Sequence, residues 1–307
     1  EMDNYLRLAI KNNVVATIGI FLLILFSTFS LIIANDGDFK KEKVVYKKIN
    51  GIELSVNVYY PQNNAGQKKP AIAFFHGGGW AYESPQKFDL ACVRYTNMGF
   101  VCFAFEYRLS ITEDGKVPHP DITLVECVKD ARSAMRWLKD NAETYGIAPD
   151  KIVACGQSAG GQLALGAALF NEINEANDAL AINPEPNAII LYSSNFNTVE
   201  AWADMIMDDR RDEIWSVSPY HNLKPGMPPV IAFHGTADRM VPYSVVKRFR
   251  DKTKNMGNQF ELITFDGRRH YLGDADQSKK AYYNEKILQR TDEFLKKLGF
   301  IDSLKSN

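Results

Sequence analysis

The chain has 307 residues, of which 46% are hydrophobic and 24% charged, the composition of an ordinary globular protein with room for one large α/β domain. Its formal net charge is −1, so no basic surface for nucleic acid is expected. The four cysteines form no CxxC pair, so the sequence indicates no zinc site, and we expect buried free thiols.

The N-terminal segment differs in composition from the rest of the chain. Residues 14–34 form an uncharged apolar run that follows Arg7 and Lys11. The run is longer than the core of a signal peptide and matches a spanning helix of about 20 residues, which favours an uncleaved anchor; cleavage at Ala34 is the alternative. The lysines after the run oppose export by the positive-inside rule, although large domains can be translocated regardless. We therefore interpret residues 1–38 as a signal peptide or membrane anchor with a linker. We expect the protein outside the cytoplasm, secreted or membrane-anchored.

Residues 39–307 alternate between short apolar runs and stretches of helical spacing, which predicts one catalytic domain. Strands are expected over residues 44–49, 52–59, 71–75, 100–105, 152–155, 188–192, 230–233 and 260–265. Helices are expected over residues 88–97, 124–145, 159–170, 245–256 and 279–298. The pair Asn50-Gly51 predicts a tight hairpin between the first two strands. The other strands, separated by helices, predict an α/β fold with about eight strands in a mostly parallel sheet.

Residues 195–223 break this alternation. They carry tryptophans and methionines among charged residues and contain no clear strand. We interpret them as a cap-like insertion over the carboxyl edge of the sheet, where ligands bind in such folds.

The motif GQSAG at residues 156–160 lies between an expected strand and an expected helix. A GxSxG pattern alone is weak, but this strand–turn–helix setting is what a nucleophile elbow needs. The turn is strained, so the neighbours of Ser158 must be small, as Ala159 and Gly160 are. The helix start also directs backbone N–H groups toward negative charge. Ser158 is therefore the candidate nucleophile.

A second motif, HGGGW at residues 76–80, directly follows an expected strand. Its glycines allow close approach of the backbone to a ligand, with N–H groups exposed. Such a loop supplies oxyanion-hole donors together with the N–H of the residue after the nucleophile, here Ala159. The lysine and the spacing of a phosphate-binding P-loop are missing.

The acid and the base are selected by chain order, because a nucleophile elbow is followed by the acid and then the histidine. Asp238 follows the expected strand 230–233, and His270 follows the strand 260–265. Asp238 would orient His270 and stabilise its cation. Rival candidates are disfavoured by their place before the elbow, within the insertion or next to another candidate: His76, His119, His221, His234, Asp209, Asp212 and Glu213.

Together these motifs resemble the α/β-hydrolase superfamily, and more closely its HGGGW-bearing branch of hormone-sensitive-lipase-like esterases and bacterial feruloyl and acetyl-xylan esterases. The matching segments, within residues 45–300, are HGGGW at 76–80, EYRLS at 106–110, DARSAMRWLKDNAETYGI at 130–147, GQSAGGQLAL at 156–165, SPYHNL at 218–223 and HGTADRMVP at 234–242, with His270. The resemblance implies a catalytic triad of Ser158, Asp238 and His270. It implies backbone oxyanion donors at Gly77, Gly78 and Ala159.

The same resemblance implies a serine carboxylesterase acting through an acyl-enzyme on short acyl esters, including acetyl or feruloyl groups on carbohydrate, with no metal or organic cofactor. Two positions depart from the usual pattern: Gln157 before the nucleophile, and the pair Arg268-Arg269 before the histidine. An amidase, formamidase or peptidase on the same triad is the alternative. A catalytically silent, membrane-tethered interaction protein is disfavoured because all three triad residues are present. Side chains expected to line the pocket, with core packing as the alternative for the insertion tryptophans, are Trp80, Tyr82, Gln157, Trp202 and Trp215.

Overall fold

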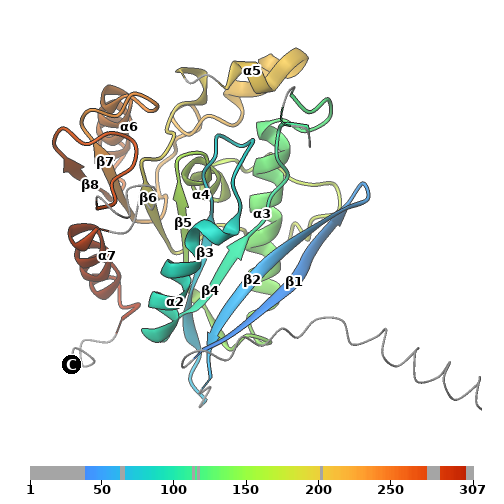
Figure 1. Ribbon diagram of the computed structural model, residues 1–307, viewed down its shortest axis with the longest axis vertical. Helices are drawn as coiled ribbons and strands as arrows, with labels where there is room; N and C mark the ends of the chain where they lie inside the picture. Colours follow the sequence, from blue (N-terminus) through green and yellow to red (C-terminus); the bar gives the residue numbers. More distant parts are fainter. Residues whose placement is uncertain are drawn as a thin grey trace, which may run out of the picture. The chain divides into compact units, whose positions relative to one another are not determined.

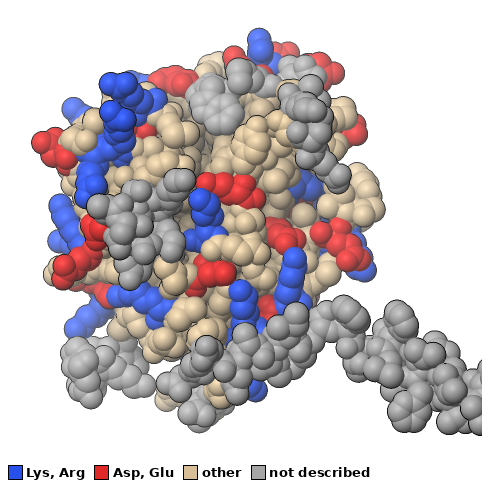
Figure 2. Space-filling model, in the orientation of Figure 1, with Lys and Arg blue, Asp and Glu red and all other residues tan. Residues whose placement is uncertain are grey.

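The computed structural model describes residues 39–62, 66–112, 115, 118–200, 203–274 and 284–301. The predicted anchor at residues 14–34, its linker and Trp202 lie outside these residues. Within the described ranges, no helix is both long and apolar enough to cross a membrane. Figure 2 shows basic and acidic side chains interspersed over one face, as the near-zero net charge leads one to expect.

One sheet of eight strands runs through the molecule in the order β1-β2-β4-β3-β5-β6-β7-β8 (Figure 1). The strands are β1 Phe39–Ile49, β2 Ile52–Pro61, β3 Lys69–Phe75, β4 Val101–Phe105, β5 Ile147–Gln157, β6 Ala188–Tyr192, β7 Val230–Gly235 and β8 Phe260–Phe265. Strand β2 pairs antiparallel with β1 and β4, and the other neighbours pair parallel. The predicted α/β fold with a mostly parallel sheet is confirmed.

Helices cover both faces of this sheet. They are α2 Asp89–Asn97, α3 Leu124–Asp140, α4 Ala159–Leu169, α5 Asp204–Met207, α6 Tyr243–Asn255 and α7 Glu285–Lys297, with short 3₁₀ helices η1 Pro85–Phe88, η2 Thr198–Glu200 and η3 Asp208–Trp215. Helices α3, α4 and α6 contribute to one buried cluster, and α2 and α7 to the other. Alternate residues of β3 face opposite clusters, with Phe75 on one side and Phe74 on the other. The apolar runs are therefore buried on both faces, as their lack of alternation predicted.

Several predicted boundaries are wrong, among them the starts of β1 and β5, which are Phe39 and Ile147 rather than residues 44 and 152. Helix α3 was expected to reach Tyr145 but ends at Asp140. The side-chain amide of Asn141 donates to the carbonyl of Trp137, and the chain then turns up to Gly146, whose φ of 63° leads into β5. The apolar spacing beyond Asp140 belongs to this turn, so periodicity alone placed the helix end too late.

The strand order reverses beside β3. The chain passes from β3 to β4 on one side, and β5 then pairs with β3 on the other. In this register Phe75 pairs with Gly156, so the loop after β3 and the turn after β5 lie next to each other. Such a reversal opens a crevice outside the carboxyl ends of the strands, where ligands bind in open α/β sheets.

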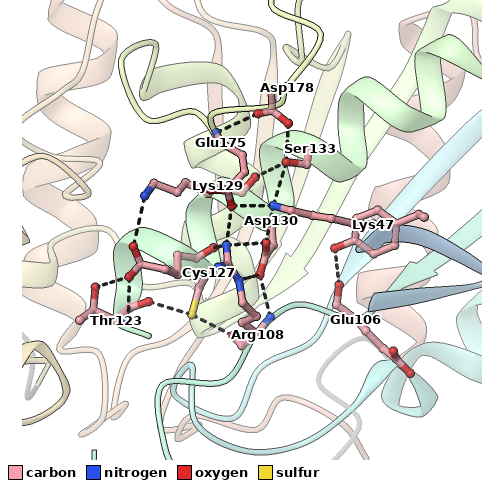
Figure 3. A network of polar contacts seen from close by, with 12 residues as sticks. Lys47, Glu106, Arg108, Thr123, Cys127, Lys129, Asp130, Ser133, Glu175 and Asp178 are labelled. Atoms are coloured by element: carbon pink, nitrogen blue, oxygen red, sulfur yellow. Dashed lines mark hydrogen bonds and ion pairs between the residues drawn. The ribbon is translucent and has the colours of Figure 1, made fainter. Parts of the chain in front are cut away.

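A buried ionic network fixes the segment that follows β4 (Figure 3). The fully buried carboxylate of Asp130 in α3 accepts hydrogen bonds from the backbone N–H of Arg108 at 2.9 Å and from its Nε at 2.8 Å. Lys47 Nζ of β1 donates to the other carboxylate oxygen at 2.6 Å. Glu175 Oε2 contacts both cations, at 2.7 Å from Arg108 and 3.0 Å from Lys47. Two cations and two anions therefore neutralise one another while joining four segments of the chain.

We expect Asp130→Asn to lower the free energy of unfolding by about 3–5 kcal/mol, because it leaves the cations of Arg108 and Lys47 buried without a full counter-charge. Urea denaturation measures the effect. Asp140→Asn, at the exposed end of the same helix, is the matched control and should change stability by less than about 0.5 kcal/mol. Equal stabilities of the two variants would contradict this account of the network.

Candidate active site

Ser158 occupies the predicted turn between β5 and α4, with φ 52° and ψ −117°. That left-handed φ is strained for a residue with a side chain. The two motif glycines make the turn feasible. A Cβ on Gly156 would lie 2.1 Å from the carbonyl oxygen of Gly160, and a Cβ on Gly160 would lie 2.0 Å from that of Phe75. The strand, the helix and the loop after β3 therefore meet backbone to backbone around this half-buried serine.

The segment after β6 connects the Ser158 turn to the His270 loop. The N–H of Ser158 donates to the carbonyl of Tyr192 at 2.9 Å, and the N–H of Asn195 donates to the carbonyl of Ser158 at 3.1 Å. On the same segment, Ser193 Oγ donates to the carbonyl oxygen of His270 at 2.7 Å. Tyr192, Ser193 and Asn195 thus hold the backbones of both candidate catalytic residues at the same edge of the sheet.

Asp238 and His270 are in direct contact. His270 Nδ1 lies 2.8 Å from Asp238 Oδ2, and both residues are buried. Oδ1 of the same carboxylate accepts the backbone N–H groups of Met240 and Val241 at 2.9 and 3.0 Å. Burial by itself would raise the pKa of Asp238, but the hydrogen bond and charge of His270 and the bond from Val241 lower it below its ordinary value. The carboxylate is therefore ionised at neutral pH and can orient the imidazole.

The unusual pair Arg268-Arg269 fits this arrangement through its backbone. A Cβ on Gly235, at the end of β7, would lie 2.2 Å from the carbonyl oxygen of Arg268 and 2.5 Å from that of Arg269. The N–H of Ala237 also donates to the carbonyl of Arg268 at 3.0 Å. Both arginine residues are exposed. The loop before His270 therefore packs on Gly235 with main-chain atoms, and small side chains are not required there.

Residues 76–80 form the glycine loop after β3. Its backbone is held by Tyr107, the second residue after β4. Its buried hydroxyl donates to the carbonyl oxygens of His76 and Gly77, each at 2.9 Å. His76 Nδ1 lies 3.0 Å from the same Gly77 oxygen, and the imidazole stacks on the Tyr107 ring with centroids 4.2 Å apart. Burial lowers the pKa of His76 to about 4, so it is neutral and serves the loop as a hydrogen-bond donor. Burial also raises the pKa of Tyr107, which keeps its hydroxyl protonated.

The predicted pocket residues divide into buried and exposed groups. Trp80 is only 2% exposed, and its Nε1 donates to Gln162 Oε1 of α4 at 3.0 Å, so the indole packs under the loop. Gln157 is also buried. Tyr82, 53% exposed, and Trp215, 51% exposed, present their rings to solvent.

The insertion is tied to the loop through this same glutamine of α4. Gln162 Nε2 donates to the carbonyl of Val217 at 2.7 Å, and Gln162 Oε1 accepts from Trp80. Further along, Arg210 of η3 contacts Glu126 Oε2 near the start of α3 at 2.8 Å. Despite burial, hydrogen bonds from Arg210 and Thr123 lower the pKa of Glu126 to about 2. The insertion is thus anchored on the side of α3 and α4, where it adjoins the glycine loop.

The remaining histidines have other surroundings. His234, at the end of β7, is buried; its Nε2 lies 2.9 Å from the carbonyl oxygen of Val241 and 3.3 Å from Asp238 Oδ2. Burial lowers the pKa of His234, so the imidazole is neutral and adds a second donor beside the acid. His221 contacts Ser218 Oγ at 2.8 Å within the insertion, and His119 accepts from the N–H of Asp121. The strand-end position of His234 was the signal that it lies near the acid.

Glu83 is a neighbour of the glycine loop that sequence reasoning missed. Its φ of 71° is left-handed, and its Oε1 pairs with Lys87 Nζ at 3.0 Å. Its Oε2 is buried without a hydrogen-bond partner among the described residues. A Cβ on Gly77 would lie 3.4 Å from this oxygen. Lys87 therefore neutralises a carboxylate that borders the loop.

No group of three or more His, Cys, Asp or Glu side chains in the described part of the chain is arranged to hold a metal ion. The four cysteines are buried free thiols, as predicted: Cys92, Cys102, Cys127 and Cys155.

Comparison with known proteins gives the class. Residues 56–253 match the family model BD-FAE, and the chain belongs to this family of α/β-hydrolase esterases. The solved structure of Thermogutta terrifontis esterase 2 phosphorylated by paraoxon is 34% identical and covers 85% of this chain and 95% of its own, with a TM-score of 0.75. Structures of the same esterase with propionate bound and with butyrate bound match with the same identity and TM-score.

Curated relatives are more distant. A probable isoprenylcysteine alpha-carbonyl methylesterase of Arabidopsis thaliana is 24% identical over 237 residues, covering 70% of this chain and 48% of the relative. Esterase-5A of Drosophila persimilis is 29% identical over 116 residues, covering 37% of this chain and 21% of the relative. The chain thus spans about half the length, or less, of these two curated relatives.

The lowered pKa of Asp238 predicts a pH dependence of stability. A carboxyl group whose pKa is lower in the folded than in the unfolded state stabilises the fold above the unfolded value, here near 3.8, and loses that contribution as the pH falls through the folded value. We therefore expect Asp238→Asn to flatten the fall in unfolding free energy between about pH 5 and about pH 2. Asp251→Asn, exposed on α6, should retain the wild-type slope. Parallel curves for wild type and Asp238→Asn would contradict the expectation.

Proposed function

We propose that this protein is a serine carboxylesterase that hydrolyses short-chain acyl esters through a triad of Ser158, His270 and Asp238. The observation that carries the proposal is the buried contact between His270 Nδ1 and Asp238 Oδ2, at the sheet edge where the strained Ser158 turn lies. This contact leaves Nε2 as the imidazole nitrogen for proton transfer. Membership of an esterase family supports the same reaction class.

In the first half of the reaction, Ser158 Oγ attacks the ester carbonyl carbon while His270 Nε2 takes the hydroxyl proton. Asp238 stabilises the imidazolium that forms and keeps its own carboxylate ionised. The carbonyl oxygen becomes an oxyanion, which the backbone N–H groups of Gly77, Gly78 and Ala159 stabilise. The start of α4 adds the favourable end of a helix dipole at Ala159.

The tetrahedral intermediate then collapses. The bond to the alcohol oxygen breaks, His270 gives its proton to the departing alcohol, and an acyl-enzyme ester on Ser158 remains. Water repeats the sequence, with His270 as base, and releases the carboxylic acid and the free serine. No step draws on a group other than the side chains and backbone named above.

The substrate class is proposed from the relatives. Thermogutta terrifontis esterase 2 has been solved with propionate and with butyrate bound, which supports a site for short acyl groups. Acetyl or feruloyl esters of carbohydrates are proposed as natural substrates because the HGGGW, GQSAGGQLAL and HGTADRMVP segments resemble those of feruloyl and acetyl-xylan esterases. An activity panel of acyl esters of increasing length, acetylated xylan and feruloyl esters ranks these substrates.

We also propose that residues 14–34 direct the catalytic domain out of the cytoplasm and attach it to a membrane. The uncharged apolar run supports this proposal. Fractionation of cells expressing the full chain tests it. Recovery of the protein in the cytosolic fraction would contradict it.

Ser158→Ala should lower kcat/KM for p-nitrophenyl butyrate at least about 10³-fold, because the nucleophile is removed while the backbone donors remain. Paraoxon should place a diethylphosphoryl group on Ser158 of the wild type and none on the variant, as mass spectrometry of peptides reports. The exposed serine of α6 provides the matched control, and Ser244→Ala should retain full activity and labelling.

Wild-type rates in Ser158→Ala would disprove the nucleophile assignment. Parallel assays with p-nitrophenyl acetate and p-nitroacetanilide separate an esterase from an amidase. Faster hydrolysis of the anilide would replace the proposed ester substrate with an amide on the same triad.

A further inference from the structure

The hydroxyl of Tyr107 donates to two successive carbonyl oxygens of the glycine loop, and this sets the direction of the N–H groups that follow them. The peptide bonds after His76 and Gly77 are trans. In a trans peptide the C=O and the following N–H point in opposite directions. Both carbonyls point to the buried hydroxyl at 2.9 Å, so the N–H groups of Gly77 and Gly78 point away from it, to a common side. Adjacent N–H groups aimed at one side form an anion-binding concavity.

In an extended strand, successive carbonyls alternate in direction, so this common direction needs a specific hold. The hydroxyl has a single proton, which it shares between the two oxygens. His76 Nδ1 adds a second donor to the Gly77 oxygen at 3.0 Å. Gly78 continues the chain with φ 88°, and a Cβ there would lie 2.1 Å from the carbonyl oxygen of Tyr82. The loop conformation is thus set by donors on its carbonyl side and by a glycine that admits the turn.

Tyr107 is itself fixed on both sides. The preceding residue, Glu106, accepts a hydrogen bond from the Tyr46 hydroxyl at its carbonyl oxygen, at 2.8 Å. The following residue, Arg108, donates its backbone N–H to the fully buried Asp130 carboxylate at 2.9 Å (Figure 3). Three residues on, Ser110 donates from its backbone N–H and its Oγ to the carbonyl of Trp80, at 2.8 and 3.0 Å. The ionic network therefore reaches the glycine loop through the segment that carries Tyr107.

We propose that Tyr107 is a positioning residue that orients the oxyanion donors of Gly77 and Gly78 by holding the two carbonyl groups on the opposite side of the loop. The inference rests on the proposed function, in which these N–H groups stabilise the oxyanion. Without the hydroxyl, the peptides at His76 and Gly77 can rotate and turn a carbonyl oxygen toward the developing negative charge. The effect falls on the transition state, because the ground-state ester carries no full charge on its carbonyl oxygen.

Tyr107→Phe in the full chain removes one oxygen atom and leaves the ring. We expect kcat for p-nitrophenyl butyrate to fall about 10- to 100-fold, less than the 10²–10³ typical for deleting a donor outright, because the N–H groups remain. KM should stay within about twofold, as expected when only transition-state stabilisation is lost. Inhibition by an alkyl trifluoromethyl ketone, which forms an oxyanion on the serine, should weaken by the same factor as kcat. The pH profile of kcat should keep its shape, because Tyr107 transfers no proton.

Tyr59→Phe is the matched control. It also removes the hydroxyl of a buried tyrosine that donates a hydrogen bond, to Asp89 of α2 at 2.6 Å, but this hydroxyl bonds neither the glycine loop nor the segment that carries Tyr107. A shift in thermal midpoint similar to that of Tyr107→Phe with unchanged kcat supports positioning over general destabilisation. Should Tyr107→Phe fail to fold, His76→Phe removes the other donor to the Gly77 oxygen while keeping a stacked ring, and a smaller loss of the same kind is expected.

Wild-type kcat and inhibitor affinity in a folded Tyr107→Phe would overturn the inference and leave the proposed esterase intact. So would equal losses of kcat in Tyr107→Phe and Tyr59→Phe. If Tyr107→Phe does not fold, unchanged kcat in His76→Phe overturns it. A wild-type protein with no ester hydrolysis and no labelling by paraoxon would instead refute the proposed function, and the inference with it.

Discussion

The close approach of three backbone segments at Gly160 is the constraint on which the candidate site depends. The carbonyl oxygen of Phe75 at the end of β3 lies against Gly160 in the first turn of α4, and the carbonyl oxygen of Gly160 lies against Gly156 at the end of β5, so no side chain fits at either glycine. This contact places the Ser158 turn beside the glycine loop and holds the serine at φ 52°. The strain is offset by two hydrogen bonds, one that the N–H of Ser158 donates to Tyr192 and one that the carbonyl of Ser158 accepts from Asn195. A larger residue at Gly156 or Gly160 would push the Ser158 turn away from the glycine loop, although neither position carries a catalytic side chain.

Much of the fold could be predicted from the sequence, because local patterns determine it. Strands β6 and β8 have the bounds predicted from their apolar runs, and the Asn50-Gly51 turn has the positive φ values of the expected hairpin. The contact between Asp238 and His270 was expected from chain order alone. Order suffices there because each residue follows a strand of one parallel sheet, and the carboxyl ends of parallel strands meet at one edge. The end of α3 was misplaced since apolar spacing continued into a turn.

The contacts around Tyr107 could not be predicted from the sequence, because they depend on distant segments and not on local patterns. Asp130 binds partners from β1, from the segment after β4 and, through shared cations, from the loop after α4, and these lie far apart in the sequence. No periodicity marks such tertiary polar contacts. The sequence marks EYRLS at residues 106–110 only as a motif shared with relatives, and it gives no role for Tyr107. The burial of Trp80 could not be predicted either, because an aromatic residue after a glycine loop can face a ligand or pack beneath the loop. Here the indole donates a hydrogen bond to Gln162.

The groups assigned to catalysis and the large exposed side chains of the neighbouring connections differ in how they are held. The groups assigned to catalysis are held by main-chain packing and by buried donors, so their geometry changes little with surface sequence. Large exposed side chains lie on the connections that follow the same strands: Tyr82 after β3, Trp215 after β6, Met240 after β7 and Tyr271 beside His270. Because these side chains are exposed, we expect substitutions at their positions to leave the contact at Gly160 intact. One fold can thus serve relatives as different in name as a Thermogutta terrifontis esterase and plant methylesterases.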